Sequence, residues 1–177
     1  TGTIKSGDRW YMRDQNFTGT LSGSNFNATW DNIKIDFAEI TETGTWDLIT
    51  GSTGSADARH ESAFIEVGGL MYLLGGRGLD PVNIYDPNTN TWTDGATPPV
   101  EMHHLQPVEI DGLIYIIAGY SGSCCSSEFG LDHIYIYDPV ADEWHEGAEI
   151  PEARRRGSVG TVVYNDEIYI IGGLEGG

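Results

Sequence analysis

The sequence predicts an all-β protein built from repeated four-stranded antiparallel sheets. Two observations carry this prediction: a short apolar segment with a central tyrosine recurs three times, and two of its copies precede a Tyr-Asp-Pro turn and a tryptophan. The composition agrees, because 24 glycines together with 11% aromatic residues favour short strands joined by tight turns over helices.

The recurring apolar segment has the pattern of a buried strand that ends in a tight backbone turn. Its copies read LMYLLGG, LIYIIAG and EIYIIGG, at residues 70–76, 113–119 and 167–173. Each copy ends in small residues, which allow one stretch of backbone to pass close to another. The segment is therefore expected to be the second strand of each repeat.

A hairpin is predicted after the first two copies. Tyr85 precedes Trp92 by 7 positions, and Tyr137 precedes Trp144 by the same 7, with turn-forming residues between them. Trp46 ends a similar Thr-Gly-Thr-Trp segment and lies 46 positions before Trp92, which lies 52 before Trp144. A period near 50 with four strands per unit is typical of propeller blades.

This ordered recurrence over about residues 45–173 resembles the kelch repeat. The resemblance implies a kelch-type β-propeller of four-stranded antiparallel blades, of the kind found in secreted bacterial proteins. A blade cannot bury its two apolar faces alone, so neighbouring blades must stack. Because a closed propeller needs roughly four to eight blades, we expect an incomplete propeller that requires further blades or another subunit.

The organisation of the chain follows from these repeats. Residues 45–177 are expected to hold the blades, at about 59–102 and 103–154, with a half blade at 155–177. Residues 1–44 are expected to hold degenerate strands, either a partial blade or a preceding segment. Within them, 32–40 is predicted as a strand, and Trp10-Tyr11 as part of an earlier one.

The charge and the N-terminal residues bear on partners and location. A formal charge of -18 would repel a phosphate backbone, so nucleic-acid binding is not expected. No stretch approaches the roughly 20 apolar residues of a membrane helix. The chain starts at Thr1, as a processed chain or fragment would, and Asn16 and Asn27 fit the N-glycosylation pattern. An extracellular or periplasmic location is expected.

Arginines gather where kelch-like propellers usually meet their ligands, on loops at one face of the disc. Arg59 and Arg156 stand 13 positions before the tyrosines of their strands, where kelch repeats carry an arginine, and Arg77 follows Gly-Gly. Guanidinium groups suit the capture of carboxylates. Alternatively, Arg59 and Arg156 bond backbone carbonyls at blade edges. The arginines taken as ligand-binding candidates are Arg59, Arg77, Arg154, Arg155 and Arg156.

Histidines form a second group of candidates. His60 and His103 occupy equivalent positions in adjacent blades, His104 follows His103, and the third blade has Gly157 at that position. Imidazoles around an axis could hold a metal or contact a substrate. Because structural histidines are the more common case, we assign no metal ligand and no cofactor, and we take His60, His103 and His104 as ligand-binding candidates.

The loop at 121–132 departs most in length, with nine more residues than its counterpart in the first blade. Such a loop either carries recognition or tolerates an insertion. It contains Cys124 and Cys125, whose adjacency would strain a disulfide between them. Two free thiols, a vicinal disulfide and a link to another chain remain open, so the pair marks a disulfide or a reactive loop.

The motifs of common enzyme families are absent from the sequence: it has no G-x-S-x-G elbow, no H-E-x-x-H helix and no phosphate-binding glycine loop. We therefore expect a non-catalytic binding module that presents a loop face to a protein or carbohydrate ligand. Two alternatives stay open. One is a propeller enzyme, oxidase-like or carbohydrate-active, with an axial histidine site. The other is a structural subunit of a larger assembly.

Overall fold

The structure is a computed structural model that describes residues 26–30, 33–37, 48–123 and 127–175. The chain falls into two compact units, residues 1–48 and 49–177. In the first unit, β1 (Phe26–Trp30) pairs antiparallel with β2 (Ile33–Phe37). The predicted strand at 32–40 thus overlaps β2, whereas Trp10-Tyr11 and Trp46 lie outside the described residues.

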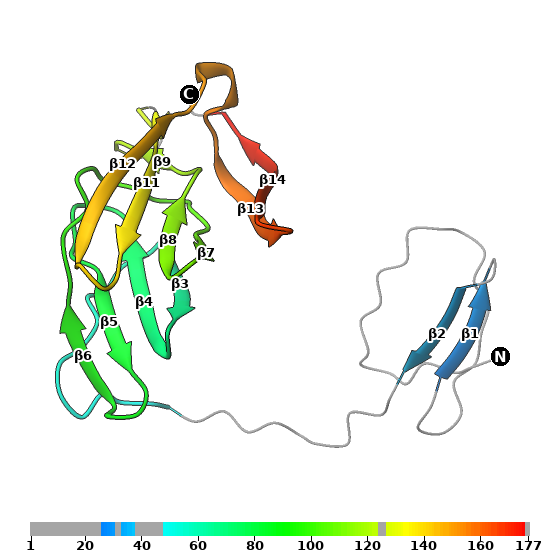
Figure 1. Cartoon of the computed structure of the whole chain (residues 1–177), viewed down its shortest axis with the longest axis horizontal. Helices are drawn as coiled ribbons and strands as arrows, with labels where there is room; N and C mark the ends of the chain where they lie inside the picture. The colour runs from blue at the N-terminus through cyan, green and yellow to red at the C-terminus, as the bar shows by residue number, and fades with distance from the viewer. Residues whose placement is uncertain (1–25, 31–32, 38–47, 124–126, 176–177) are drawn as a thin grey trace. The chain divides into compact units, whose positions relative to one another are not determined.

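The second unit contains two four-stranded antiparallel sheets and a two-stranded hairpin, side by side in Figure 1. Sheet order follows chain order, and the two-stranded ribbon of β9 and β10 lies in the connection between β8 and β11. The first sheet consists of β3 (Ser62–Val67), β4 (Leu70–Gly75), β5 (Asn83–Asp86) and β6 (Thr91–Asp94). The second consists of β7 (Val108–Ile110), β8 (Leu113–Ile116), β11 (His133–Asp138) and β12 (Glu143–Glu149). The remaining elements are β9 (Tyr120–Ser121), β10 (Phe129–Gly130), the 3-10 turn η1 (Glu152–Arg154), β13 (Gly157–Tyr164) and β14 (Glu167–Leu174).

The predicted four-stranded antiparallel blades are confirmed, and the described sheets do not close into a ring. The three recurring apolar segments form β4, β8 and β14, the second strand of each sheet. Within the described ranges, no helix is long and apolar enough to cross a membrane.

The turn between the third and fourth strands explains the repeated Tyr-Asp-Pro motif. Asn90 and Asp142 have left-handed backbones, with φ of 56° and 54°, and each accepts a hydrogen bond from the tyrosine five residues earlier. The Tyr85 hydroxyl lies 2.8 Å from Asn90 Oδ1, and the Tyr137 hydroxyl lies 2.6 Å from Asp142 Oδ1. Because Asn and Asp tolerate this conformation, each blade closes its outer hairpin in the same way.

The hydrophobic core lies between the two four-stranded sheets. Tyr72 of β4 meets Tyr137 of β11 edge to face, with ring centroids 6.1 Å apart. The indole of Trp144 donates to the carbonyl of Ala96 at 3.1 Å, which connects the outer strand of one blade to the loop after the other. The buried side chains of this core come from both blades and are Val67, Tyr72, Leu74, Val82, Met102, Leu105, Ile114, Ile116, Leu131, Tyr135 and Tyr137.

A repeated backbone contact joins successive blades near the end of each second strand. Gly76 donates its N–H to the carbonyl of Met102 at 2.9 Å, and Gly119 donates to Arg156 at the same distance. Gly75 has a left-handed φ of 67°, and a Cβ there would lie 2.6 Å from the Met102 carbonyl oxygen. Gly75 is therefore required by both the turn and the approach of the next blade.

Candidate functional site

The candidate site begins with a second repeated contact between blades. Glu61, His104 and Ser158 occupy equivalent positions, and all three have left-handed backbones, with φ of 60°, 54° and 55°. His104 donates its N–H to the Glu61 carbonyl at 2.9 Å, and Ser158 donates to His104 at 2.8 Å. Because this arrangement repeats, it belongs to the scaffold, and the chemistry depends on which side chain each blade supplies.

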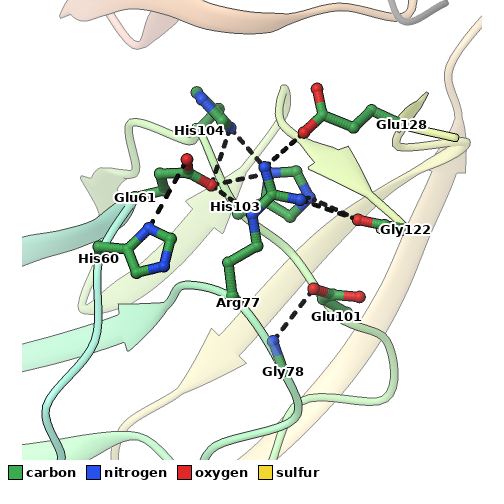
Figure 2. Close-up of polar contacts among 9 residues, drawn as sticks. All are labelled: His60, Glu61, Arg77, Gly78, Glu101, His103, His104, Gly122 and Glu128. Carbon is green, nitrogen blue, oxygen red and sulfur yellow. Dashed lines mark hydrogen bonds and ion pairs between the residues drawn. The ribbon is translucent and has the colours of Figure 1, made fainter. Parts of the chain in front are cut away.

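At the seam between the first two blades, Glu61 meets two histidines (Figure 2). Its Oε2 atom lies 3.4 Å from His104 Nδ1 and 3.7 Å from His103 Nδ1, and the two Nδ1 atoms lie 2.8 Å apart. The His103 side chain is completely buried, whereas that of His104 is 29% exposed. These three groups have the composition and spacing of a metal-ligand set.

Arg77 lies beside these groups and links them to the long loop (Figure 2). Its Nε donates to Glu61 Oε2 at 2.5 Å, and its Nη2 forms an ion pair with Glu128. Its Nη1 lies 3.0 Å from the Gly122 carbonyl oxygen and 3.1 Å from His103 Nε2. We call the group Glu61, Arg77, His103, His104 and Glu128 the axial cluster. Within it, Arg77 is paired with two carboxylates of its own chain.

The charges of the axial cluster stabilise one another. Desolvation opposes the ionisation of Glu61, but the hydrogen bond from Arg77 and the charges of His104, Arg77 and His60 outweigh it and lower the pKa of Glu61. The hydrogen bond from Arg77 to Glu128 raises the pKa of Arg77. Desolvation lowers this pKa, but the hydrogen bond to Glu61 also raises it, so the net shift is upward. Both groups are therefore ionised at neutral pH.

The three blades treat the equivalent positions 60, 103 and 157 differently. The side chain of His60 is 72% exposed, and its Nδ1 lies 3.6 Å from Glu61 Oε1. His103 is buried and packs its ring 6.1 Å from that of Tyr120. In the third blade, a Cβ on Gly157 would lie 2.7 Å from the Tyr120 ring, so glycine leaves room for the tyrosine.

Arg59 lies inside the first blade, where its side chain is 1% exposed. It donates to the carbonyls of Gly75 at 3.2 Å and Pro81 at 3.0 Å, and to Asn83 Oδ1 at 2.7 Å. Asn83 is itself buried and also accepts from the backbone N–H of Asp57. These contacts favour the interpretation of Arg59 as a structural tie between strands.

The three consecutive arginines lie in the link between the second sheet and the terminal hairpin. Arg154 ends η1 and is exposed. Arg155 donates to the Ile150 carbonyl at 2.9 Å and to Glu149 at 3.0 Å. Arg156 reaches the carbonyls of Arg154 and Gly172 at 3.3 and 3.4 Å. None of these three arginines shares a hydrogen-bond partner with Arg77 among the described residues.

Arg155 also borders a cavity that the sequence analysis did not foresee. Two adjoining hollows of about 370 and 280 Å³ share Phe129, Gly130 and Arg155 in their linings. Phe129 is 66% exposed near the end of the long loop, whereas Tyr135, which lines one of the hollows, is buried. The carboxylates in the linings are Asp132, Glu152 and Glu175, all exposed.

Several predicted site residues lie outside the described residues. Cys124, Cys125 and Asn16 are among them, and Asn27 falls in β1, where only the backbone is described. Conversely, Glu61 and Glu128 belong to the axial cluster although neither is among the site residues predicted from the sequence. Glu61 had a detectable signal, since it stands where the next blade has His104. Glu128 lies in an insertion with no counterpart in the first blade, so repeat alignment offered no signal.

Four-stranded antiparallel sheets that stack on one another, with connecting loops that meet at the seam between them, are characteristic of a β-propeller repeat protein. The Kelch motif family model matches residues 103–151. Kelch-like protein terF of Aspergillus terreus is 33% identical over 142 residues, covering 74% of this chain and 31% of that protein. Kelch-like protein 35 of Mus musculus is 28% identical over 124 residues, covering 67% of this chain and 20% of that protein. The chain belongs to the kelch-repeat family.

A solved structure supports the fold independently. The chain titled "Structure of YjhT" superimposes with a TM-score of 0.63 at 14% identity, covering 85% of this chain and 54% of that one. The chain spans less than a third of the length of the first curated relatives it matches, at 31% and 20%. The likeness to the solved structure concerns the fold alone.

Proposed function

We propose that this chain is a non-catalytic binding module whose loop face takes a protein segment carrying positive charge and an apolar anchor. The observation that carries the proposal is the exposed ring of Phe129 beside the cavity that it shares with Arg155. Kelch repeats generally serve as protein-binding modules, and several relatives are kelch-like proteins. Exposed aromatic side chains beside a hollow are typical anchor sites for a partner.

The charges around the cavity favour a cationic ligand. The guanidinium of Arg155 is held by Glu149 and the Ile150 carbonyl. The carboxylate of Glu152 is exposed, and that of Asp132, also exposed, contacts only the neutral or weakly basic groups of Tyr135 and His133. The formal charge of -18 on the whole chain adds a long-range attraction for cationic partners. Arg77, the candidate for capturing an acidic peptide, is already paired with carboxylates of its own chain.

The cavity also lies where a propeller presents its loops. Phe129 and Gly130 come from the connection between the second and third strands of the second blade. Glu152 and Arg155 come from the link to the next sheet, and Val100 comes from the link between the first two. Loops on a rigid scaffold can vary without disturbing the blades, which suits a recognition surface.

Selection of displayed random peptides on the immobilised full chain tests the proposal. We expect enriched peptides to be rich in Lys and Arg with an aromatic or aliphatic residue, and their affinity to fall at least tenfold on Phe129→Ala. Phe64→Ala is the matched control, because Phe64 is 54% exposed on β3. Enrichment that is equal on the two variants, or that yields acidic peptides, would contradict the proposal. Binding only to a glycan array would favour the carbohydrate alternative.

A further inference from the structure

We propose that the axial cluster binds a divalent first-row transition-metal ion through His103 Nδ1, His104 Nδ1 and Glu61 Oε2, with Zn²⁺ as the best-fitting ion. The three atoms lie 2.8, 3.4 and 3.7 Å from one another. A tetrahedral Zn²⁺ with bonds of about 2.0–2.2 Å holds neighbouring ligand atoms about 3.4 Å apart. The observed triangle brackets that value, so small side-chain adjustments would suffice. None of the three proposed ligands lines the proposed ligand cavity.

His103 Nε2 has two polar neighbours, Arg77 Nη1 at 3.1 Å and the Gly122 carbonyl oxygen at 3.1 Å, and the ring is completely buried. Arg77 Nη1 is a donor, so in the tautomer that a metal ligand needs, with the proton on Nε2, this contact has to lengthen and the Gly122 carbonyl is the acceptor. When the proton is on Nε2, it donates to this carbonyl, and the lone pair of Nδ1 is directed at the other two ligands. Histidines bound to metal almost always donate their second ring N–H in this way.

The guanidinium of Arg77 is compatible with an ion at this place. It donates to Glu61 Oε2, which retains a second lone pair, and donors to ligating carboxylates are common around metal ions. Arg77 also donates to Gly122, whose carbonyl has two lone pairs and so accepts from both Arg77 and His103. The two carboxylates of Glu61 and Glu128 and the single guanidinium of Arg77 give the cluster an excess of about one negative charge, which favours a cation.

The competing interpretation is a closed network of hydrogen bonds within the chain. In that case one of the two histidines donates its Nδ1 proton to the other across the 2.8 Å contact, and the network binds no metal. The two interpretations differ in one property, which is the affinity of the wild-type chain for metal. Because His104 is partly exposed, an ion can reach the cluster from solvent, and water can take the fourth coordination position of that ion.

The test is a titration of the chelator-stripped full chain with Zn²⁺ by calorimetry and with Co²⁺ by visible absorption. We expect one ion per chain. Glu61→Gln and His104→Ala each remove one of three ligands and should weaken binding about 100-fold or more, above the 10–100-fold typical for outer partners. His60→Ala is the matched control, because His60 also contacts Glu61 but through the other oxygen. His145→Ala controls for exposed histidines in general.

Three outcomes would overturn the proposal. The first is the absence of stoichiometric Zn²⁺ binding by the wild-type chain. The second is a loss of affinity on His60→Ala or His145→Ala as large as on His104→Ala, which would indicate adventitious binding to surface histidines. The third is wild-type affinity in Glu61→Gln. Circular dichroism checks folding, and if His104→Ala is unfolded, Glu61→Gln decides because it preserves the shape of the side chain.

Discussion

Replacing Arg59 by methionine tests whether this arginine is a structural tie or a ligand contact. Methionine keeps most of the length of the side chain but donates no hydrogen bond, so the carbonyls of Gly75 and Pro81 lose their buried donor. Asn83 Oδ1 loses one of two donors. Each buried acceptor left unpaired costs about 1–3 kcal/mol, and removal of a buried charge offsets part of the cost. We expect a destabilisation of about 2–4 kcal/mol.

The assay is thermal or urea unfolding of the full chain. For a chain of this length, about 2–4 kcal/mol corresponds to a decrease in Tm of roughly 4–16 °C. Arg154→Met is the matched control, because Arg154 is exposed at the end of η1, and we expect a change within about 0.5 kcal/mol. The stability of the Arg59→Lys variant should fall between those of the other two, since lysine keeps the charge but lacks the several N–H donors of the guanidinium group. Equal stability of the Arg59→Met and Arg154→Met variants would refute the tie.

Three further predictions concern the turns and the axial cluster. Gly75→Ala should destabilise the chain by about 1–3 kcal/mol more than Gly68→Ala, as measured by urea unfolding. Both glycines have left-handed φ, but only at Gly75 would the Cβ lie 2.6 Å from a carbonyl oxygen of the next blade. Asp142→Ala should cost about 1–3 kcal/mol in the same assay, because the buried Tyr137 hydroxyl loses its acceptor, whereas Asp142→Asn should cost less. Folding lowers the pKa of Glu61 from 4.5, so its carboxylate stabilises the native state above about pH 5 and loses this effect as pH falls through the folded-state pKa. The stability difference between wild type and Glu61→Gln should therefore shrink as the pH falls below 4.5, and a constant difference would contradict this assignment.

The strands were predictable because their signals are local. An apolar segment that ends in glycine needs only its own residues to indicate a buried strand and a turn, and β4, β8 and β14 lie where these segments recur. The same holds for the hairpins, in which Tyr85 and Tyr137 bond a turn residue five positions later. The ion pair between Arg77 and Glu128 joins residues 51 positions apart, and no local pattern indicates it.

Residues at equivalent positions of the repeat also have different roles, because their surroundings differ from blade to blade. Arg59 and Arg156 occupy the same position, yet Arg59 is bound by residues of the β4–β5 connection and β5, whereas no third strand stands beside β14 among the described residues. Likewise, His103 is buried against Tyr120, and His60 faces solvent. The scaffold's backbone sets where the side chain at each repeat position lies, but its environment depends on the strands and loops around it. Function in this chain is therefore expected where the repeats differ at a seam, and the axial cluster and the Phe129 cavity both lie at such seams.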